Sequence, residues 1–234
     1  MTGNVKVKTL HKWNISITEA TSLQKDLASQ LNINGEPSKV ETIAGIDMAY
    51  DKRTNRGFVS IVILSYPALN VIEVVNNNAP IIMPYVPGYL SFREAPLILQ
   101  TLEKLTITPD LIFIDGQGIA HPRGLGLAAH IGLFVDIPVI GVAKSLLIGK
   151  YDEPDKEMGS FRKLLYQDKI VGYVLRSRDN VKPIFISPGN NIGTIEAREW
   201  AIKLITKYRI PEPTRLADKI VAKYKKECLD ELKN

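Results

Sequence analysis

The chain has 234 residues, of which 45% are hydrophobic, so it can bury a substantial core, and we expect one domain over residues 1–234. The net charge of +5 is a mild basic excess, compatible with a polyanionic partner but not diagnostic of one. The single cysteine, Cys228, excludes an intrachain disulfide and any multi-cysteine zinc site, and no run approaches the ~18 apolar residues of a membrane span. With no apolar signal segment at the N-terminus, we expect a cytoplasmic protein that does not associate with membranes.

Hydrophobic periodicity predicts alternating helices and short strands. Helices are predicted at 16–31, 91–105, 124–134, 194–207 and 213–232. Strands are predicted at 42–48, 57–64, 70–75, 111–114, 138–142, 169–176 and 183–187. Short connections indicate an antiparallel meander for the first three strands and a hairpin for the last two, whereas 76–79 reads as a loop and 187–191 as a turn. This order indicates an α/β fold with a mixed sheet and helices on both faces.

Two aspartates interrupt the apolar strands. Asp47 stands where a core residue is expected, and Asp115 ends the strand at 111–114 just before Gly116. A lone Asp before glycine is usually a turn residue, but side chains at the ends of neighbouring strands can share one crevice. Two carboxylates held together repel unless a cation neutralises them, which favours a hard ion such as Mg²⁺ or Mn²⁺. Only three histidines are present, which argues against a histidine-rich zinc site.

Three further charged residues each allow two interpretations. Glu94 lies three residues after Ser91, which is the spacing of a helix capping box, but it can also be a third acid of a site. Lys144 follows a predicted strand directly and can hold a phosphate, orient a water molecule or simply be solvated. Arg123 precedes the start of the helix predicted at 124–134, where anions are attracted, although the nearby glycines alone are weak evidence of a phosphate site.

Tyr85 directly follows Pro84 and precedes Pro87 by two residues. The prolines restrict the backbone, so the ring can project rigidly from its loop. Rigid apolar or aromatic tips unstack bases by wedging between them. A tyrosine packed on the core beside a stiff turn is the alternative.

Five segments together closely resemble the endonuclease V family, in family order over about residues 40 to 220. They are AGIDMAY at 44–50, PYVPGYLSFRE at 84–94, DGQGIAHPRGLG at 115–126, GVAK at 141–144 and PTRLAD at 213–218. Five motifs in register are far more specific than any one of them.

The resemblance implies an RNase H-like α/β fold with a mixed five-stranded central sheet, helices on both faces, and an added C-terminal hairpin and helices. It implies a metal-dependent endonuclease of DNA repair that recognises hypoxanthine, the deaminated form of adenine. Such an enzyme hydrolyses the second phosphodiester bond 3′ to the lesion and leaves a 3′-OH and a 5′-phosphate. We expect a monomer that acts on damaged DNA with Mg²⁺, for which Mn²⁺ substitutes.

By position, the resemblance implies that Asp47 and Asp115 are metal carboxylates, Glu94 a third acid and Lys144 a residue that orients phosphate or water. Asp218 falls where family members carry histidine or aspartate and can join the metal shell. The residues that correspond to the wedge, the lesion pocket and the strand-binding loops are Tyr85, Pro84, Pro87, Gly88, Gly118, His121 and Arg123. Asn190 and Asn191 depart from the family, which often has histidine after the preceding glycine.

Three alternatives remain. The first is a nuclease of the same fold that acts on inosine in RNA. The second is a nucleic-acid-binding module without activity, against which the full set of Asp47, Glu94, Asp115 and Lys144 argues. The third, a small-molecule phosphate transferase, is disfavoured because the sequence has no Walker-type loop.

Overall fold

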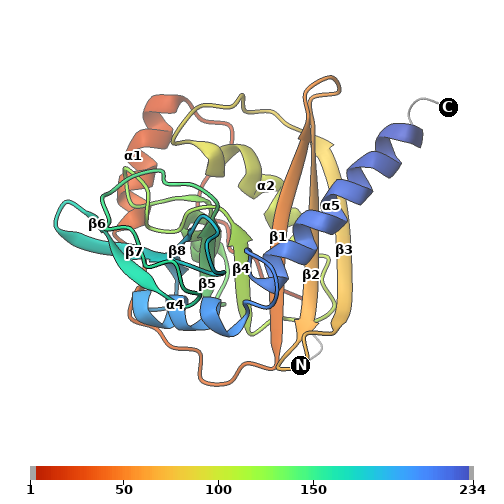
Figure 1. The fold of residues 1–234 in the computed structure, drawn as a ribbon. Coiled ribbons are helices and arrows are strands. Elements are labelled where there is room, and N and C mark those ends of the chain that lie inside the picture. The colour runs from red at the N-terminus through yellow and green to blue at the C-terminus, as the bar shows by residue number, and fades with distance from the viewer. Residues whose placement is uncertain (1–3, 232–234) are drawn as a thin grey trace.

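The computed structural model describes residues 4–231, which form a mixed sheet covered by helices (Figure 1). Eight strands are hydrogen-bonded in the order β3-β2-β1-β4-β5-β8-β7-β6. They are β1 (Thr42–Asp51), β2 (Arg56–Ser65), β3 (Val71–Pro80), β4 (Leu111–Asp115), β5 (Val139–Ala143), β6 (Phe161–Tyr166), β7 (Lys169–Leu175) and β8 (Ile184–Asn190). The prediction of a five-stranded sheet was wrong, because the C-terminal hairpin joins the same sheet: β8 pairs antiparallel with β5.

The centre of the sheet contains the antiparallel meander that was expected from the sequence. β1, β2 and β3 form the antiparallel meander, while β4 lies parallel to both β1 and β5. The register pairs Ile46 of β1 with Ile114 of β4. Asp47 and Asp115, the next residue of each strand, therefore reach the same edge of the sheet.

Five helices cover the two faces of the sheet. They are α1 (Ile17–Ala28), α2 (Leu90–Leu102), α3 (Leu127–Phe134), α4 (Thr194–Lys203) and α5 (Glu212–Glu231). On one face α2 and α3 pack with alternate residues of β1, β2 and β4, and α1 packs on α3. On the other face α4 covers β5 and β8, and α5 lies across β1 and β2 with its C-terminal end extending past the sheet (Figure 1). None of these helices is both long and apolar enough to cross a membrane.

The observed helix ends agree only in part with those predicted from capping residues and hydrophobic periodicity. The first helix begins as predicted, because the Ser16 side chain and Glu19 form a reciprocal capping box. Of the two interpretations of Glu94, the capping box with Ser91 was wrong: Tyr89 holds the N-cap position, while Ser91 is buried inside α2 and hydrogen-bonds His130 on α3 at 2.9 Å. Four helices are also shorter than predicted: α1 ends at Ala28, α2 at Leu102 and α4 at Lys203, and α3 begins at Leu127.

Two segments predicted as irregular are strands. Residues 76–79 continue β3, where Asn76 accepts a hydrogen bond from Ser60 and Asn78 accepts two from Arg56 on the neighbouring strand. Residues 187–190 continue β8, since Gly189 leaves room for the carbonyl oxygen of Ala128 on α3. Strand β6 was not predicted at all.

Candidate active site

The close approach of α5 to β1 brings a third carboxylate to the edge that carries Asp47 and Asp115. A Cβ atom on Gly45 would lie 2.0 Å from the carbonyl oxygen of Pro213, so only glycine allows α5 to start so near the strand. Asp47 is two residues beyond Gly45 on the strand, and Asp218 is five residues beyond Pro213 on the helix. Both spacings span about 7 Å. Asp218 consequently lies beside Asp47, and it contributes to the raised pKa of Asp47.

Lys144 links the aspartates at this edge. It follows the last residue of β5, and its Nζ lies 2.5 Å from Oδ2 of Asp115 and 3.9 Å from Oδ1 of Asp218. Burial lowers the pKa of Lys144, but the ion pair with Asp115 outweighs this and raises the pKa above its usual value. The charges of Asp47 and Asp218 raise it further. The ammonium group is therefore charged at neutral pH and offsets part of the repulsion among the carboxylates.

Burial and mutual repulsion perturb two of the acids strongly. Burial, together with the charge of Asp115, raises the pKa of Asp47 to about 8 against the opposing charge of Lys144. Burial also raises the pKa of Glu94 on α2 to about 7; the adjacent Arg93 opposes this, and the charge of Asp115 adds to it. We call Asp47, Glu94, Asp115, Lys144 and Asp218 the acidic cluster, because they meet from β1, α2, β4, the end of β5 and α5.

The donor set of the acidic cluster suits a hard cation. Among the described residues, no group of three or more His, Cys, Asp and Glu side chains is arranged to hold a metal ion. Mg²⁺ does not need such a group, since it is bound by as few as one or two carboxylates, with water and substrate phosphate completing its shell. Asp47 and Asp115, on neighbouring parallel strands with oxygen donors only, meet that requirement.

A second group of predicted residues converges on one carbonyl oxygen, that of Gly88. His121 Nε2 lies 3.0 Å from this oxygen, Arg123 Nη2 donates to it at 2.7 Å and Gln24 Nε2 at 3.1 Å. Arg123 also donates to Gln24 Oε1 and stacks on the ring of Tyr89. We call Gln24, His121 and Arg123 the Gly88 clamp. Gly88 itself has φ of 81°, a conformation that other residues rarely adopt.

His121 acts in this clamp as a neutral ring. Burial and the charge of Arg123 lower the pKa of His121 to about 4. Its Nδ1 accepts a hydrogen bond from the main-chain N–H of Arg123, which assigns the remaining ring proton to Nε2, facing Gly88. The clamp fixes the end of the loop from which Tyr85 projects with 65% of its surface exposed. The alternative of a tyrosine packed on the core was therefore wrong.

Two other predicted positions have structural partners. Gly118 is buried against β8: a Cβ atom there would lie 2.0 Å from the carbonyl oxygen of Pro188, and its N–H donates to Ser187. Asn190, where the sequence departs from the family, accepts from the N–H of Asn32 and donates to the carbonyl of Gly132. It therefore joins the segment after α1 to α3.

Sequence analysis missed Gln24. The signal was present, because Gln24 lies on the apolar stripe of α1, four residues after Ala20 and three before Leu27. A polar side chain on a buried stripe needs partners, and here it has Gly88, Leu125 and Arg123.

Comparison with known proteins agrees with this geometry. The family model for endonuclease V matches residues 25–219. The chain belongs to the endonuclease V family. Endonuclease V of Kosmotoga olearia is 43% identical over 226 residues, covering 96% of this chain and 99% of the relative, and that of Dehalococcoides mccartyi is 45% identical over 214 residues, covering 92% and 96%. Membership makes the protein a nuclease, and the family resemblance predicted from the five motifs is confirmed.

Solved endonuclease V structures share the fold. The Bacillus subtilis structure superposes with a TM-score of 0.91 at 32% identity, covering 97% of this chain and 99% of that one. Endonuclease V of Ciona intestinalis superposes with a TM-score of 0.79 at 28% identity, covering 91% and 98%; that protein was crystallised with DNA containing an inosine followed by a ribo-adenosine.

Proposed function

We propose that this endonuclease V family member is a divalent-metal-dependent endonuclease that nicks nucleic acid at deaminated adenine. It hydrolyses the second phosphodiester bond 3′ to hypoxanthine and leaves a 3′-OH and a 5′-phosphate. The observation that carries the proposal is the convergence of Asp47, Glu94, Asp115 and Asp218 with Lys144 at one edge of the sheet. The inosine-containing DNA bound by the Ciona relative supports the choice of substrate.

Asp47 and Asp115, joined by Asp218, are the residues that would hold the ion, for which Mg²⁺ is the proposed species and Mn²⁺ a substitute. When bound, such an ion polarises the phosphate and stabilises negative charge on the leaving oxygen. A divalent charge beside Asp47 favours its ionised form, which burial alone disfavours.

Side chains of the protein carry out proton transfer and phosphate binding. Glu94 has a pKa of about 7, so its carboxylate can accept a proton from the attacking water at neutral pH. The Lys144 ammonium, held between Asp115 and Asp218, is placed to bind a non-bridging phosphate oxygen as charge develops there. The water attacks phosphorus in line, and the bond to the 3′-oxygen breaks.

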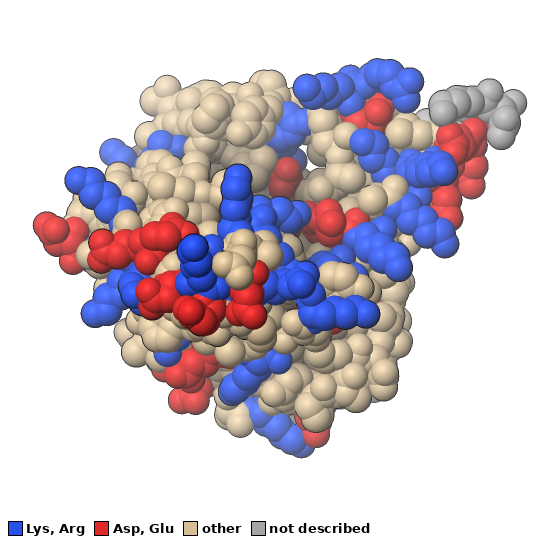
Figure 2. All heavy atoms as spheres, viewed as in Figure 1, with Lys and Arg blue, Asp and Glu red and all other residues tan. Residues whose placement is uncertain are grey.

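Tyr85 is proposed as the wedge that fills the gap left by the displaced lesion, with Pro84 and Pro87 stiffening its loop. His121 and Arg123 serve this step through Gly88, whose carbonyl they hold. Figure 2 shows Lys and Arg side chains gathered over α5. This helix carries Asp218 together with the exposed Lys219, Lys223 and Lys226, which favour a polyanionic partner. We further propose that the chain acts as a monomer with a single RNase H-like domain.

A second candidate activity is cleavage at inosine in RNA. The ribo-adenosine after the inosine in the Ciona complex places a ribonucleotide next to the lesion in a relative, which favours testing both sugars.

The experiment is a nicking assay on end-labelled strands with one hypoxanthine, as deoxyinosine or riboinosine, with Mg²⁺ or EDTA. The proposal predicts a metal-dependent nick at the second phosphodiester bond 3′ to the lesion, which joins its 3′ neighbour to the following nucleotide. It predicts no nick on the matched adenine strand. Nicking only of riboinosine would establish the second candidate instead. Equal nicking of the adenine strand would contradict lesion recognition.

A further inference from the structure

The main chain at Lys144 lies just beyond the part of β5 that the sheet holds. The last register pair between β5 and β8 joins Ala143 to Phe185, and Lys144 is the next residue. Its carbonyl oxygen therefore lacks a ladder partner on β8, while its side chain must keep the ion pair with Asp115. Some other group has to fix this peptide if the ammonium is to stay in place.

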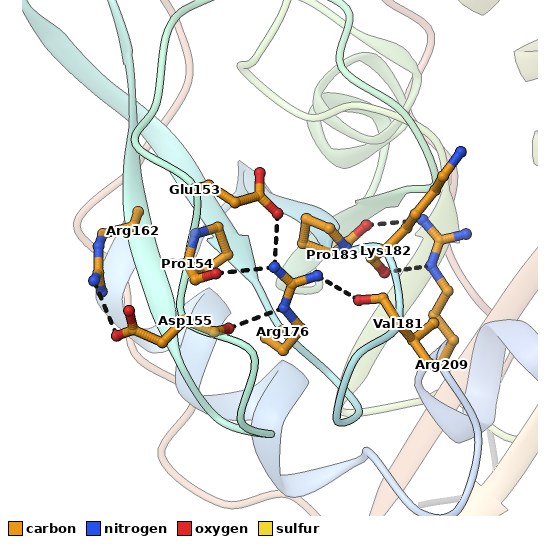
Figure 3. A network of polar contacts seen from close by, with 9 residues as sticks. All are labelled: Glu153, Pro154, Asp155, Arg162, Arg176, Val181, Lys182, Pro183 and Arg209. Carbon is orange, nitrogen blue, oxygen red and sulfur yellow. Dashed lines mark hydrogen bonds and ion pairs between the residues drawn. The ribbon is translucent and has the colours of Figure 1, made fainter.

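Arg209, in the connection between α4 and α5, binds this peptide. Its Nη2 donates to the carbonyl oxygens of Lys144 and Pro183, and its Nε donates to that of Lys182, each at 2.8 Å. Figure 3 shows the guanidinium group directed at the 182–183 segment, which leads into β8. One side chain thus joins the end of β5 to the start of the neighbouring strand.

The connection between α4 and α5 also bears on the side-chain ammonium of Lys144. It leads into α5, whose Asp218 lies 3.9 Å from the Lys144 ammonium. The next carbonyl, that of Ser145, accepts a hydrogen bond at 3.1 Å from Gln117, two residues after Asp115. Lys144 is therefore held at its carbonyl by Arg209, at its ammonium by the aspartates, and through the following peptide by Gln117.

We propose that Arg209 is a positioning residue: it fixes the Lys144 main chain and so keeps the ammonium group aimed at the reacting phosphate. The inference rests on the proposed function of the acidic cluster. The planar guanidinium suits this task, because its nitrogens point to three carbonyls at once from a rigid fork, which a lysine ammonium cannot reproduce.

The first test is a double-mutant cycle of Arg209→Lys and Lys144→Ala, followed by single-turnover nicking of a deoxyinosine duplex with Mg²⁺. Arg209→Lys should slow nicking by about 10- to 100-fold, since small displacements of catalytic groups cost rates of that order. Binding of the same duplex in EDTA should be unchanged. In the Lys144→Ala background, Arg209→Lys should have less than about a twofold further effect, because the group it positions is gone.

Arg176→Lys is the matched control. Figure 3 shows the Arg176 guanidinium in the same region, bound to Glu153 and to the carbonyls of Pro154, Asp155 and Val181. This variant also loses a guanidinium that joins loops, but none of these partners is Lys144, so we expect nicking at the wild-type rate. An equal loss in Arg176→Lys, or a full loss by Arg209→Lys in the Lys144→Ala background, would overturn the proposal.

A crystal structure of Arg209→Lys tests the tether without any activity. We expect the Lys144 main chain to shift and its Nζ to leave the 2.5 Å contact with Asp115. An unchanged Lys144 would overturn the inference. A shifted Lys144 in a protein whose wild type does not nick would support the tether and refute the proposed function.

Discussion

The acidic cluster and the Gly88 clamp are built in opposite ways, although the sequence singles out residues of both. In the acidic cluster, three aspartates share one ammonium group, and the pKa values of Asp47 and Glu94 are raised to about 8 and about 7. In the Gly88 clamp, a neutral histidine, an arginine and a glutamine satisfy one carbonyl oxygen and each other. The acidic cluster holds charged groups in a buried setting that disfavours them, which is typical of catalytic sites. The Gly88 clamp uses its hydrogen bonds to fix a loop.

The contrast predicts that changes to the acidic cluster abolish chemistry with little loss of fold. Asp47→Ala and Asp115→Ala should each lower the nicking rate by about 10³-fold or more, because each removes a ligand of the ion proposed to stabilise charge on the reacting phosphate. Thermal unfolding followed by circular dichroism should show a folded protein in both cases. Retained turnover would refute the assignment of these residues as metal ligands.

Tyr85→Ala should act on binding instead. Loss of a stacked ring costs about 1–3 kcal/mol per base, so affinity for a hypoxanthine duplex should fall about tenfold, with a smaller loss for undamaged duplex. Tyr85→Phe keeps the ring and should bind both duplexes as the wild type does. Equal losses on the two duplexes for Tyr85→Ala would exclude a wedge.

Weakening the Gly88 clamp should affect stability and lesion binding together. Arg123→Lys cannot reach both Gly88 and Gln24, so the free energy of unfolding should fall by about 1–3 kcal/mol, with a loss of lesion affinity smaller than that of Tyr85→Ala. The rate of nicking from bound duplex should stay near wild type. Arg178→Lys, at an exposed arginine, serves as the control. If Arg123→Lys lowered the rate of nicking from bound duplex and left lesion affinity unchanged, the Gly88 clamp would act in the chemical step.

A pH dependence of stability also separates the two regions. In the metal-free protein, folded Asp47 keeps a proton between pH 3.8 and about 8 that the unfolded chain releases, so this group lowers stability as the pH rises through that range. Asp47→Asn removes the effect, and its melting temperature in EDTA should exceed that of the wild type by more at pH 8 than at pH 5. Asp26→Asn, at an exposed residue, serves as the control. A pH-independent difference for Asp47→Asn would contradict the raised pKa.

The sequence was most informative where local pattern and packing agree. The apolar strand that ends at Asp115, the strand that carries Asp47 and the start of α1 were predicted and are confirmed. Strand β6 was missed because it lies at the sheet edge, paired with β7 alone among the named strands, with only Leu164 buried. Such a strand leaves little hydrophobic alternation in the sequence.

The other errors come from partners that are distant in the chain. Asn78 continues β3 because Arg56 and Tyr224 bind it, and Ser91 lies within α2 because His130 binds it. The same holds for the site: spacing left Glu94 open between a cap and an acid, and the structure excludes the cap. No local signal shows that Arg209 reaches Lys144, 65 residues away in the sequence.

Asp47 and Asp115 are proposed to share one divalent ion beside a bound sugar-phosphate strand. The most direct measurement is a crystal structure of the protein with an inosine-containing oligonucleotide and Mn²⁺, with the ion located by anomalous scattering. The account predicts an ion about 2 Å from an oxygen of each carboxylate and in contact with a phosphate of the strand. An ion bound elsewhere, with Asp115 paired only to Lys144, would contradict it.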